Sequence, residues 1–207
     1  MTDLLIGTTN AGKVREYADL LAELVTAGVT LKNLRDVGLA TFDVDEPYAT
    51  YEENALHKAQ TYAEKSGLIA LADDSGIDVD ALDGRPGVYS ARYAGAGATD
   101  QQRYEKLLRE LEGVPDEKRT ARFVCVVAVV DPKTGAVEYG RGVVEGRVAR
   151  APDAKAFHGF GYDPVFVADG HSVSIGALPP DEKHAISHRG RAARAALPGV
   201  RRRLGLA

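Results

Sequence analysis

An uninterrupted apolar run near the middle of the chain places the strongest constraint on its fold. Residues 123–130 are all apolar, and a strand of this composition needs cover on both faces of its sheet. The segment 131–135, Asp-Pro-Lys-Thr-Gly, has the composition of a turn, and residues 137–148 have the composition of a second strand. We therefore expect a long hairpin whose first strand, residues 122–130, lies in the middle of a sheet. This hairpin is a candidate for a second lobe.

The remaining segments alternate between short strands and helices. Strand-like composition is found in residues 4–7, in residues 68–72 and in a stretch after Phe166. Helical spacing of apolar residues is found in the segment that carries Tyr17, Leu20, Leu21 and Leu24, in residues 50–65, in residues 100–111 and in residues 181–204, which form one or two helices. Strands that pair directly, combined with strands separated by helices, predict an α/β fold with a mixed central sheet flanked by helices.

Size and composition fit a single domain over residues 1–207. The chain is 44% hydrophobic and 27% charged, as in ordinary globular proteins that bury a core. Its net charge of -4 argues against a nucleic-acid-binding surface. Cys125 lies in the apolar run, so we expect a buried thiol, and a chain without disulfides fits the cytoplasm. No apolar run approaches the roughly 20 residues that cross a bilayer, and the start of the chain lacks leader features, so we expect no membrane partner.

Residues 68–76, Leu-Ile-Ala-Leu-Ala-Asp-Asp-Ser-Gly, carry the strongest chemical signal. The apolar strand is predicted to end in two adjacent carboxylates, and their like charges raise the pKa of each unless a cation or hydrogen-bond donors neutralise them. Oxygen ligands of this kind suit Mg²⁺, which uses one or two carboxylates, several waters and substrate phosphates. The alternative is an Asx turn, in which Asp73 or Asp74 bonds backbone amides before Gly76.

Further acidic residues precede the helix predicted over residues 50–65. Asp43, Asp45 and Glu46 come shortly before it. One of them can be a second metal ligand opposite Asp74, because one carboxylate alone holds Mg²⁺ weakly. Solvated or helix-capping charges are the alternative interpretation.

Residues 8–13, Thr-Thr-Asn-Ala-Gly-Lys, lie between the first predicted strand and the first predicted helix. Backbone amides at a helix start and the helix dipole both favour an anion, and Lys13 is placed to reach a phosphate. The spacing is not that of a Walker loop. For this motif alone, a capped helix with a solvated lysine is the simpler interpretation.

Two later segments offer groups that suit a nucleotide. In Gly-Phe-Gly-Tyr-Asp-Pro, Phe160 stands between two glycines with Asp163 nearby. Such a ring can stack on a nucleobase, or it can fill the core. Near the C-terminal helices, Lys183, His188 and Arg189 are donors suited to a carbonyl or a phosphate, and the histidine spacing does not match a zinc site.

These motifs together resemble the inosine triphosphate pyrophosphatase family, in the family's order and over nearly the whole chain. The resemblance rests on residues 8–13, 53–55, 72–76, 86–92, 159–164 and 186–190. The chain departs from the family pattern twice. Pro47-Tyr48 follows Glu46 where members usually have Thr-Gly, and Ala177 stands where members often carry an acid.

The family hydrolyses purine nucleoside triphosphates with non-standard bases. The resemblance therefore implies Mg²⁺-dependent conversion of ITP, dITP and XTP to the monophosphate and pyrophosphate, in a two-lobed molecule with the substrate cleft between the lobes. It implies that Asp74 is catalytic, that Glu46 and Asp74 bind the metal, and that Asp73 supports them. The substrate-binding residues that it implies are Thr8, Thr9, Asn10, Ala11, Gly12, Lys13, Ser75, Phe160, Gly161, Tyr162, Asp163, Lys183, His188 and Arg189.

By the same resemblance, Phe160 stacks on the purine, and His188 and Arg189 donate hydrogen bonds to its 6-oxo group. Adenine carries an amino group at that position, so donors in the pocket would be left unpaired and adenine would be rejected. Members are typically homodimers, so a second copy of the chain is an expected partner.

Two other function classes stay open on the sequence. A Maf-type nucleotide pyrophosphatase would carry different loops in place of residues 160–163 and 187–189. A non-enzymatic nucleotide sensor would not need Asp73 and Asp74 beside Lys13. A metal-dependent pyrophosphate-release assay discriminates between an enzyme and a sensor.

Overall fold

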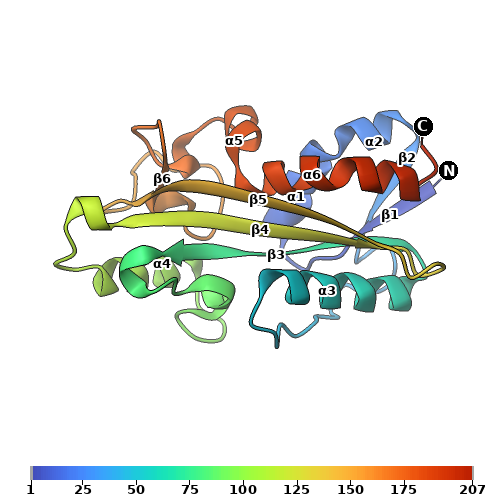
Figure 1. The fold of residues 1–207 in the computed structure, drawn as a ribbon, viewed down its shortest axis with the longest axis horizontal. Helices are drawn as coiled ribbons and strands as arrows, with labels where there is room; N and C mark the ends of the chain where they lie inside the picture. The colour runs from blue at the N-terminus through green and yellow to red at the C-terminus, as the bar shows by residue number, and fades with distance from the viewer. Residues whose placement is uncertain (1, 207) are drawn as a thin grey trace. The chain divides into compact units, whose positions relative to one another are not determined.

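The structure is a computed structural model that describes residues 2–206, and the strands of this part of the chain form a six-stranded sheet in the order β2-β1-β3-β4-β5-β6 (Figure 1). The first strand pairs in parallel with the second and third strands, and the fifth pairs antiparallel with the sixth. The expected mixed α/β sheet is therefore confirmed. The strands are β1 (Thr2–Ile6), β2 (Val29–Asn33), β3 (Ile69–Val79), β4 (Thr120–Val130), β5 (Val137–Val148) and β6 (Phe166–Ala168).

The helices begin and end where local signals in the sequence place them. The Thr50 side chain accepts a hydrogen bond from the Glu53 amide, and Gly67, in the left-handed conformation with φ 69°, ends the same helix. Thr99 and Gln102 form a capping box at the start of another. The α-helices are α1 (Ala11–Leu20), α2 (Ala22–Thr26), α3 (Tyr51–Ser66), α4 (Asp100–Glu110), α5 (Pro180–Ile186) and α6 (His188–Arg203), with 3₁₀ turns at Asp80–Leu82, Gly87–Arg92, Asp116–Lys118, Asp163–Val165 and Ile175–Ala177.

The chain divides into two compact units. Unit 1 comprises the described residues up to Asp74, Cys125–Gly142 and the described residues from Arg189 onward. Unit 2 comprises Ser75–Val124 and Val143–His188. This division confirms the expectation of two lobes, while the cleft expected between them stays a prediction. The hairpin is not a lobe by itself, because its turn belongs to unit 1 and its open end to unit 2.

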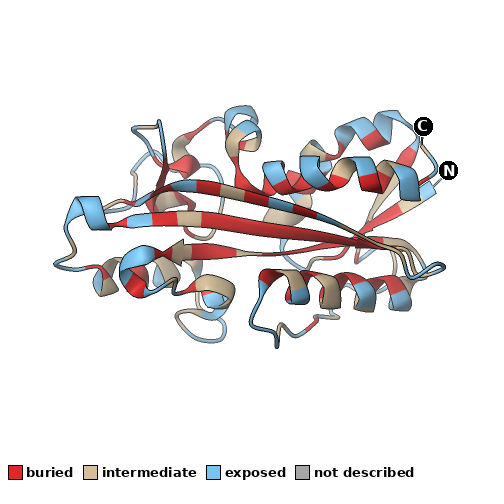
Figure 2. Cartoon of the chain, viewed as in Figure 1, coloured by how far each residue is buried: buried red, intermediate tan, exposed pale blue. Residues whose placement is uncertain are grey.

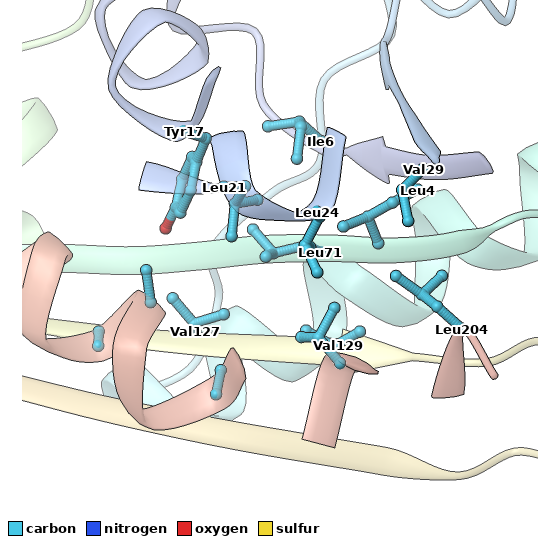
Figure 3. Close-up of a cluster of buried hydrophobic side chains, with 14 of the residues drawn as sticks. Leu4, Ile6, Tyr17, Leu21, Leu24, Val29, Leu71, Val127, Val129 and Leu204 are labelled. Carbon is cyan, nitrogen blue, oxygen red and sulfur yellow. The ribbon is translucent and has the colours of Figure 1, made fainter. Parts of the chain in front are cut away.

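The core of unit 1 lies between the sheet and the helices α1, α2 and α6. Tyr17, Leu21 and Leu24 pack against Leu71 of β3 and against alternate residues of β4 (Figure 3). Helix α3 covers the other face of these strands and buries Ala55, Ala59, Tyr62 and Ala63 (Figure 1). Cover on both faces explains why β4 is apolar throughout residues 123–130.

Unit 2 has its own core. Phe123 of β4 and Phe166 of β6 lie with ring centroids 4.3 Å apart, and Leu107 and Leu111, at the end of α4, are fully buried in the same cluster. Tyr162 and Val165 join this cluster, so the turn that precedes β6 is anchored by its own apolar side chains.

The predicted central position of the first hairpin strand is confirmed, because β4 is buried along nearly its whole length (Figure 2). Two expectations were incomplete. Strand β3 does not end before Asp73 but continues to Val79, because cations neutralise both carboxylates inside the sheet. Strand β2, which is short and half-buried, is missing from the expected strands, although its Val-Thr-Leu-Lys alternation of apolar and polar residues is a strand signal. Within residues 2–206, no helix is long and apolar enough to cross a membrane.

Candidate active site

The loop before α1 is organised by its own polar groups. The Asn10 side chain caps α1 by accepting hydrogen bonds from the amides of Gly12 (2.8 Å) and Lys13 (3.1 Å), and the Asn10 amide donates to Thr8 Oγ1 (3.2 Å). Part of the expected anion site is thus occupied by side-chain oxygens. Lys13 follows this loop in the first turn of α1, and its Nζ lies 2.9 Å from Asp73 Oδ2.

Asp73 is the centre of a buried ion-pair network. It is 2% exposed, and its Oδ2 also accepts from Arg189 Nη2 at 3.2 Å and from the Cys125 thiol at 3.6 Å. Burial raises the pKa of Asp73, but the Lys13 and Arg189 charges outweigh this and hold that pKa well below its ordinary value. Asp73 therefore carries its negative charge at neutral pH and is the shared counter-ion of Lys13 and Arg189.

Arg189 connects this network to helix α1. Its Nη1 donates to Glu16 Oε2 at 2.6 Å while its Nη2 donates to Asp73, and the side chain is almost fully buried. Both terminal nitrogens of Arg189 thus lie on carboxylates. This geometry makes Arg189 a support of Asp73, and its predicted contact with a nucleobase stays a prediction.

Asp74 lies in a separate buried cluster with Glu46. Lys58 Nζ is 3.1 Å from Asp74 Oδ1 and 2.5 Å from Glu46 Oε1, so one ammonium group bridges the two acids that sequence motifs marked as metal ligands. Asn54 Nδ2 donates to the other Asp74 oxygen at 3.2 Å. Burial raises the pKa of Asp74 above its ordinary value; the Lys58 charge opposes this shift and the Glu46 charge adds to it.

The two adjacent acids therefore differ in their environments. The pKa of Asp73 is lowered and that of Asp74 is raised, and such a separation is characteristic of sites in which one carboxylate is structural and the other takes part in proton transfer. Burial lowers the pKa of Lys58, but Asp74 and Glu46 raise it by more, so Lys58 stays an ammonium ion.

The donor set of Glu46 and Asp74 fits Mg²⁺. Both side chains are hard oxygen ligands, and both already contact one positive group, the Lys58 ammonium. Among residues 2–206, no cluster of three or more His, Cys, Asp or Glu side chains is suited to a metal. Two carboxylates completed by waters and phosphate oxygens are the usual magnesium environment. The side chains of the two networks comprise four acids and three bases, which leaves an excess of negative charge for a cation: Glu16, Glu46, Asp73 and Asp74 against Lys13, Lys58 and Arg189.

In unit 2, the predicted nucleobase-stacking residue lies on a tightly bonded turn. Phe160 is half-buried, its amide donates to Asp163 Oδ2 at 2.9 Å, and Lys183 Nζ reaches the same oxygen at 2.8 Å. Lys183 Nζ also lies 5.5 Å from the centroid of the Phe160 ring. Gly159 has φ 96°, and a Cβ there would collide with the Asp163 carboxylate, so only glycine fits.

The remaining predicted residues of this unit are mostly buried. The His188 ring stacks on Phe123 with centroids 4.6 Å apart and an interplanar angle of 20°. The Tyr162 hydroxyl donates to the Ser90 carbonyl at 2.9 Å, and Ser75 is half-buried in β3 directly after Asp74. Phe160, Asp163 and Lys183 are thus brought together, whereas His188 is held by an aromatic neighbour.

The structure places three further residues in these clusters: Glu16, which the motifs missed, and Asn54 and Lys58, whose contacts with Asp74 the motifs did not predict. Asn54 and Lys58 are four residues apart on α3, and a polar pair on the face that otherwise buries alanines is a signal that could have identified both. Glu16 follows Lys13 by three residues and therefore shares its face of α1.

The chain is similar to known proteins both in sequence and in fold. Residues 4–198 match the Ham1 family. The dITP/XTP pyrophosphatase of Geobacter sulfurreducens is 46% identical over 93% of this chain and 93% of its own length, and that of Bacillus subtilis is 44% identical over 91% and 92%. The structure of a HAM1 protein from Coxiella burnetii superposes with a TM-score of 0.84 at 38% identity, covering 98% of this chain and 100% of that one.

A nucleoside-triphosphatase / dITP/XTP pyrophosphatase structure from Mycobacterium abscessus gives a TM-score of 0.74 at 41% identity, over 97% of this chain and 100% of that one. These matches extend over nearly the whole of both chains, and they confirm the resemblance that the six sequence motifs indicated. The chain therefore belongs to the Ham1 family.

Proposed function

We propose that this protein is a Mg²⁺-dependent pyrophosphatase that converts ITP, dITP and XTP to the monophosphate and pyrophosphate, and that it thereby removes non-standard purines from the nucleotide pool. The observation that carries the proposal is the convergence of Glu46 and Asp74 on one positive group inside unit 1. A site of two carboxylates is suited to a metal that is shared with a triphosphate.

The broader activity follows from the relatives. The chain is 44–46% identical to two dITP/XTP pyrophosphatases over more than nine tenths of its length. The protein is therefore an enzyme, a hydrolase of purine nucleoside triphosphates with non-standard bases.

Asp74 has the environment required of the group that accepts a proton from the attacking water. Its two oxygens are held by Lys58 and Asn54, and its pKa is raised, so it is a stronger base than Asp73. Glu46 and Asp74 would hold Mg²⁺, which, when bound, neutralises phosphate charge and acidifies water. Water attack at the α-phosphorus forms the monophosphate and releases pyrophosphate in one step.

Lys13 and the start of α1 are the proposed phosphate contacts. The Lys13 ammonium lies on Asp73 and therefore points into the same region of unit 1 as the charged network. Binding of a phosphate at the loop competes with the Asn10 cap for the Gly12 and Lys13 amides.

Nucleobase recognition is assigned to the turn in unit 2. Phe160 offers a half-buried ring for stacking on the purine, and Lys183 and Asp163 hold the turn that carries it. His188 is the proposed donor to the 6-oxo group, together with Arg189 as the family resemblance implies. A pocket that donates to this group discriminates strongly against adenine, and guanine, which shares the 6-oxo group, is refused at its 2-amino group by lack of room or of a partner.

A substrate panel tests the proposal. ITP, dITP, XTP, ATP and GTP are incubated with the protein and Mg²⁺, and pyrophosphate and orthophosphate are measured separately. We expect pyrophosphate from the first three at rates far above those for ATP and GTP, and no product after chelation of the metal. Orthophosphate as the first product, or comparable rates on all five substrates, would contradict it. UTP and CTP are added to test the alternative, since a preference for these pyrimidine nucleotides would support a Maf-type activity instead.

The assembly and location of the protein are also proposals. We infer a homodimer and a cytoplasmic location from the family resemblance. Sedimentation equilibrium tests the first, since a monomer at micromolar concentration would contradict it. Fractionation of the source cells tests the second.

A further inference from the structure

We propose that Asp100 is a positioning residue for nucleobase recognition: it fixes the turn that presents Phe160 and does so without touching the nucleotide. The inference rests on the proposed function, in which Phe160 stacks on the purine. The Gly161 amide donates to Asp100 Oδ2 at 2.8 Å, although 61 residues separate the two in sequence.

Two successive backbone amides of the turn are held by two different carboxylates. Phe160 donates to Asp163, which is buried and paired with Lys183, and Gly161 donates to Asp100 on helix α4. Hydrogen bonds from amides to carboxylates are stronger than those between neutral groups. The backbone on both sides of the Phe160 side chain is therefore fixed, one side from within the turn and the other from α4.

Asp100 is itself held in place for this contact. It is the first residue of α4, where the Thr99–Gln102 capping box fixes the backbone and the helix dipole favours a carboxylate. Its second oxygen, Oδ1, accepts a hydrogen bond from Arg103 Nη1. The acceptor that faces Gly161 is thus directed by a regular helix rather than by a loop.

The segment that carries the turn lacks regular secondary structure, although the His158 amide donates to the Gly176 carbonyl and Tyr162 is buried in the unit 2 core, on either side of Phe160 and Gly161. Residues 149–162 contain no helix or strand, and within them the Phe157 side chain is 82% exposed. Gly161 has φ 63°, a conformation that glycine adopts without cost but also leaves readily. Loss of the tether from α4 would let the turn, and with it the Phe160 ring, occupy several poses.

Removal of a positioning residue changes substrate binding, whereas removal of a merely structural residue disturbs the packing of the fold. The Asp100 side chain is 42% exposed, so its removal disturbs no core packing. A mispositioned ring weakens binding of the nucleobase but leaves the charged cluster of unit 1 intact. The expected effect is therefore a higher KM with an unchanged kcat.

The test compares three variants of the full chain. Asp100→Ala removes the acceptor and should raise KM for ITP about tenfold with kcat unchanged, whereas Asp100→Asn keeps an acceptor oxygen and should restore most of the affinity. Glu110→Gln is the matched control, because Glu110 lies at the other end of α4 and bonds Arg85 and Tyr93. It should behave as the wild type.

Direct binding measurements complete the test. Calorimetry with IMP should show the same loss of affinity in Asp100→Ala, while the affinity for pyrophosphate, which lacks a nucleobase, should not change. If Asp100→Ala does not fold, Asp100→Glu, which keeps the charge but displaces the oxygen, should show the raised KM instead.

The possible failures are distinguishable. A wild type that releases no pyrophosphate from ITP overturns both the proposed function and this inference. An active wild type with an unchanged KM in Asp100→Ala, or equal losses of affinity for IMP and pyrophosphate, overturns the role of Asp100 alone.

Discussion

The two units hold their functional residues by different means. In unit 1 the contacts join side chain to side chain, as buried ion pairs of Lys13 with Asp73 and of Lys58 with Asp74. In unit 2 carboxylates also bond backbone amides, as Asp163 and Asp100 do with consecutive residues of one turn, and Asp163 adds one buried ion pair with Lys183. Ion pairs fix the position and protonation of charges, which phosphoryl transfer requires. Amide contacts fix the path of the backbone, which sets the orientation of a ring.

A second contrast lies within unit 1. Asp73 and Asp74 are adjacent in β3, yet Asp73 has two cationic partners and a lowered pKa, whereas Asp74 shares Lys58 with Glu46 and has a raised pKa. Variants of the two acids should therefore fail differently, one in its rate and the other in its stability.

Asp74→Asn should have the largest effect. It removes a metal ligand and the proposed proton acceptor, so we expect kcat for ITP to fall about 10³-fold, within the range attributed to general bases. Circular dichroism should show a folded protein, because the amide can still accept from Lys58. A rate within tenfold of the wild type would remove Asp74 from its assigned role.

Asp73→Asn should affect stability instead. It leaves the Lys13 and Arg189 charges without their buried counter-ion, so the free energy of unfolding should fall by about 3–5 kcal/mol. Urea denaturation measures this loss. A variant as stable as the wild type would show that the network around Asp73 contributes little to folding.

The pH dependence of stability should separate the same two acids. The folded-state pKa of Asp73 is lowered, so its stabilising contribution is present above its ordinary pKa of 3.8 and is lost as the pH falls. The folded-state pKa of Asp74 is raised, so the stabilising contribution of Asp74 is present below the ordinary pKa of 3.8 and is lost as the pH rises through the folded-state pKa. In urea denaturation of the metal-free protein from pH 3 to pH 7, the free energy of unfolding should fall less steeply toward acid pH in Asp73→Asn than in the wild type. Parallel profiles for the wild type and this variant would contradict the assignment.

Phe160→Ala tests the proposed nucleobase-binding turn of unit 2. Loss of a stacking partner should lower kcat/KM for ITP by about ten- to a hundredfold, mostly through KM, since a stacked base contributes roughly 1–3 kcal/mol. Phe160→Tyr keeps the ring and is the control. A fall in kcat alone would place Phe160 in the chemistry rather than in recognition.

The fold was predictable where its signals are local. The apolar spacing predicted helices over residues 50–65 and 100–111, which the structure has as α3 and α4, and the apolar run of residues 123–130 placed β4 inside the sheet. Strand β2 was missed although its Val-Thr-Leu-Lys alternation is the pattern of a half-buried strand, because the alternation extends over only four residues. The continuation of β3 was missed because its acids are tolerated only through partners elsewhere in the chain.

The candidate site was predictable in its motifs but not in its pairing. Lys13, Glu46 and Asp74 were identified from their segments, and in the structure Glu46 and Asp74 both contact the Lys58 ammonium, while their role as metal ligands stays a prediction. That Arg189 lies on Asp73 could not be foreseen, because 116 residues separate them and no local pattern encodes the contact. The sequence identified the charged residues. Which of them form ion pairs is decided by the packing of α1 and α6 on the sheet.

The smallest expected effect is on the free energy of unfolding, in two variants that each remove the hydroxyl of one buried tyrosine, one from each unit. The Tyr17 hydroxyl in unit 1 has no hydrogen-bond partner among residues 2–206, whereas the Tyr162 hydroxyl in unit 2 donates to the Ser90 carbonyl. An unpaired buried hydroxyl costs free energy, and a paired one contributes about 1 kcal/mol. Tyr17→Phe should therefore leave the free energy of unfolding unchanged or raise it, and Tyr162→Phe should lower it by about 1 kcal/mol.

Urea denaturation of both variants at pH 7 measures the difference, and the lost oxygen is the same in each. A comparable loss in Tyr17→Phe would mean that an ordered water bonds the Tyr17 hydroxyl. In that case the apolar core of unit 1 (Figure 3) would carry a polar contact at its boundary with the Asp73 network, and the contrast between the two units would be weaker than their side-chain contacts indicate.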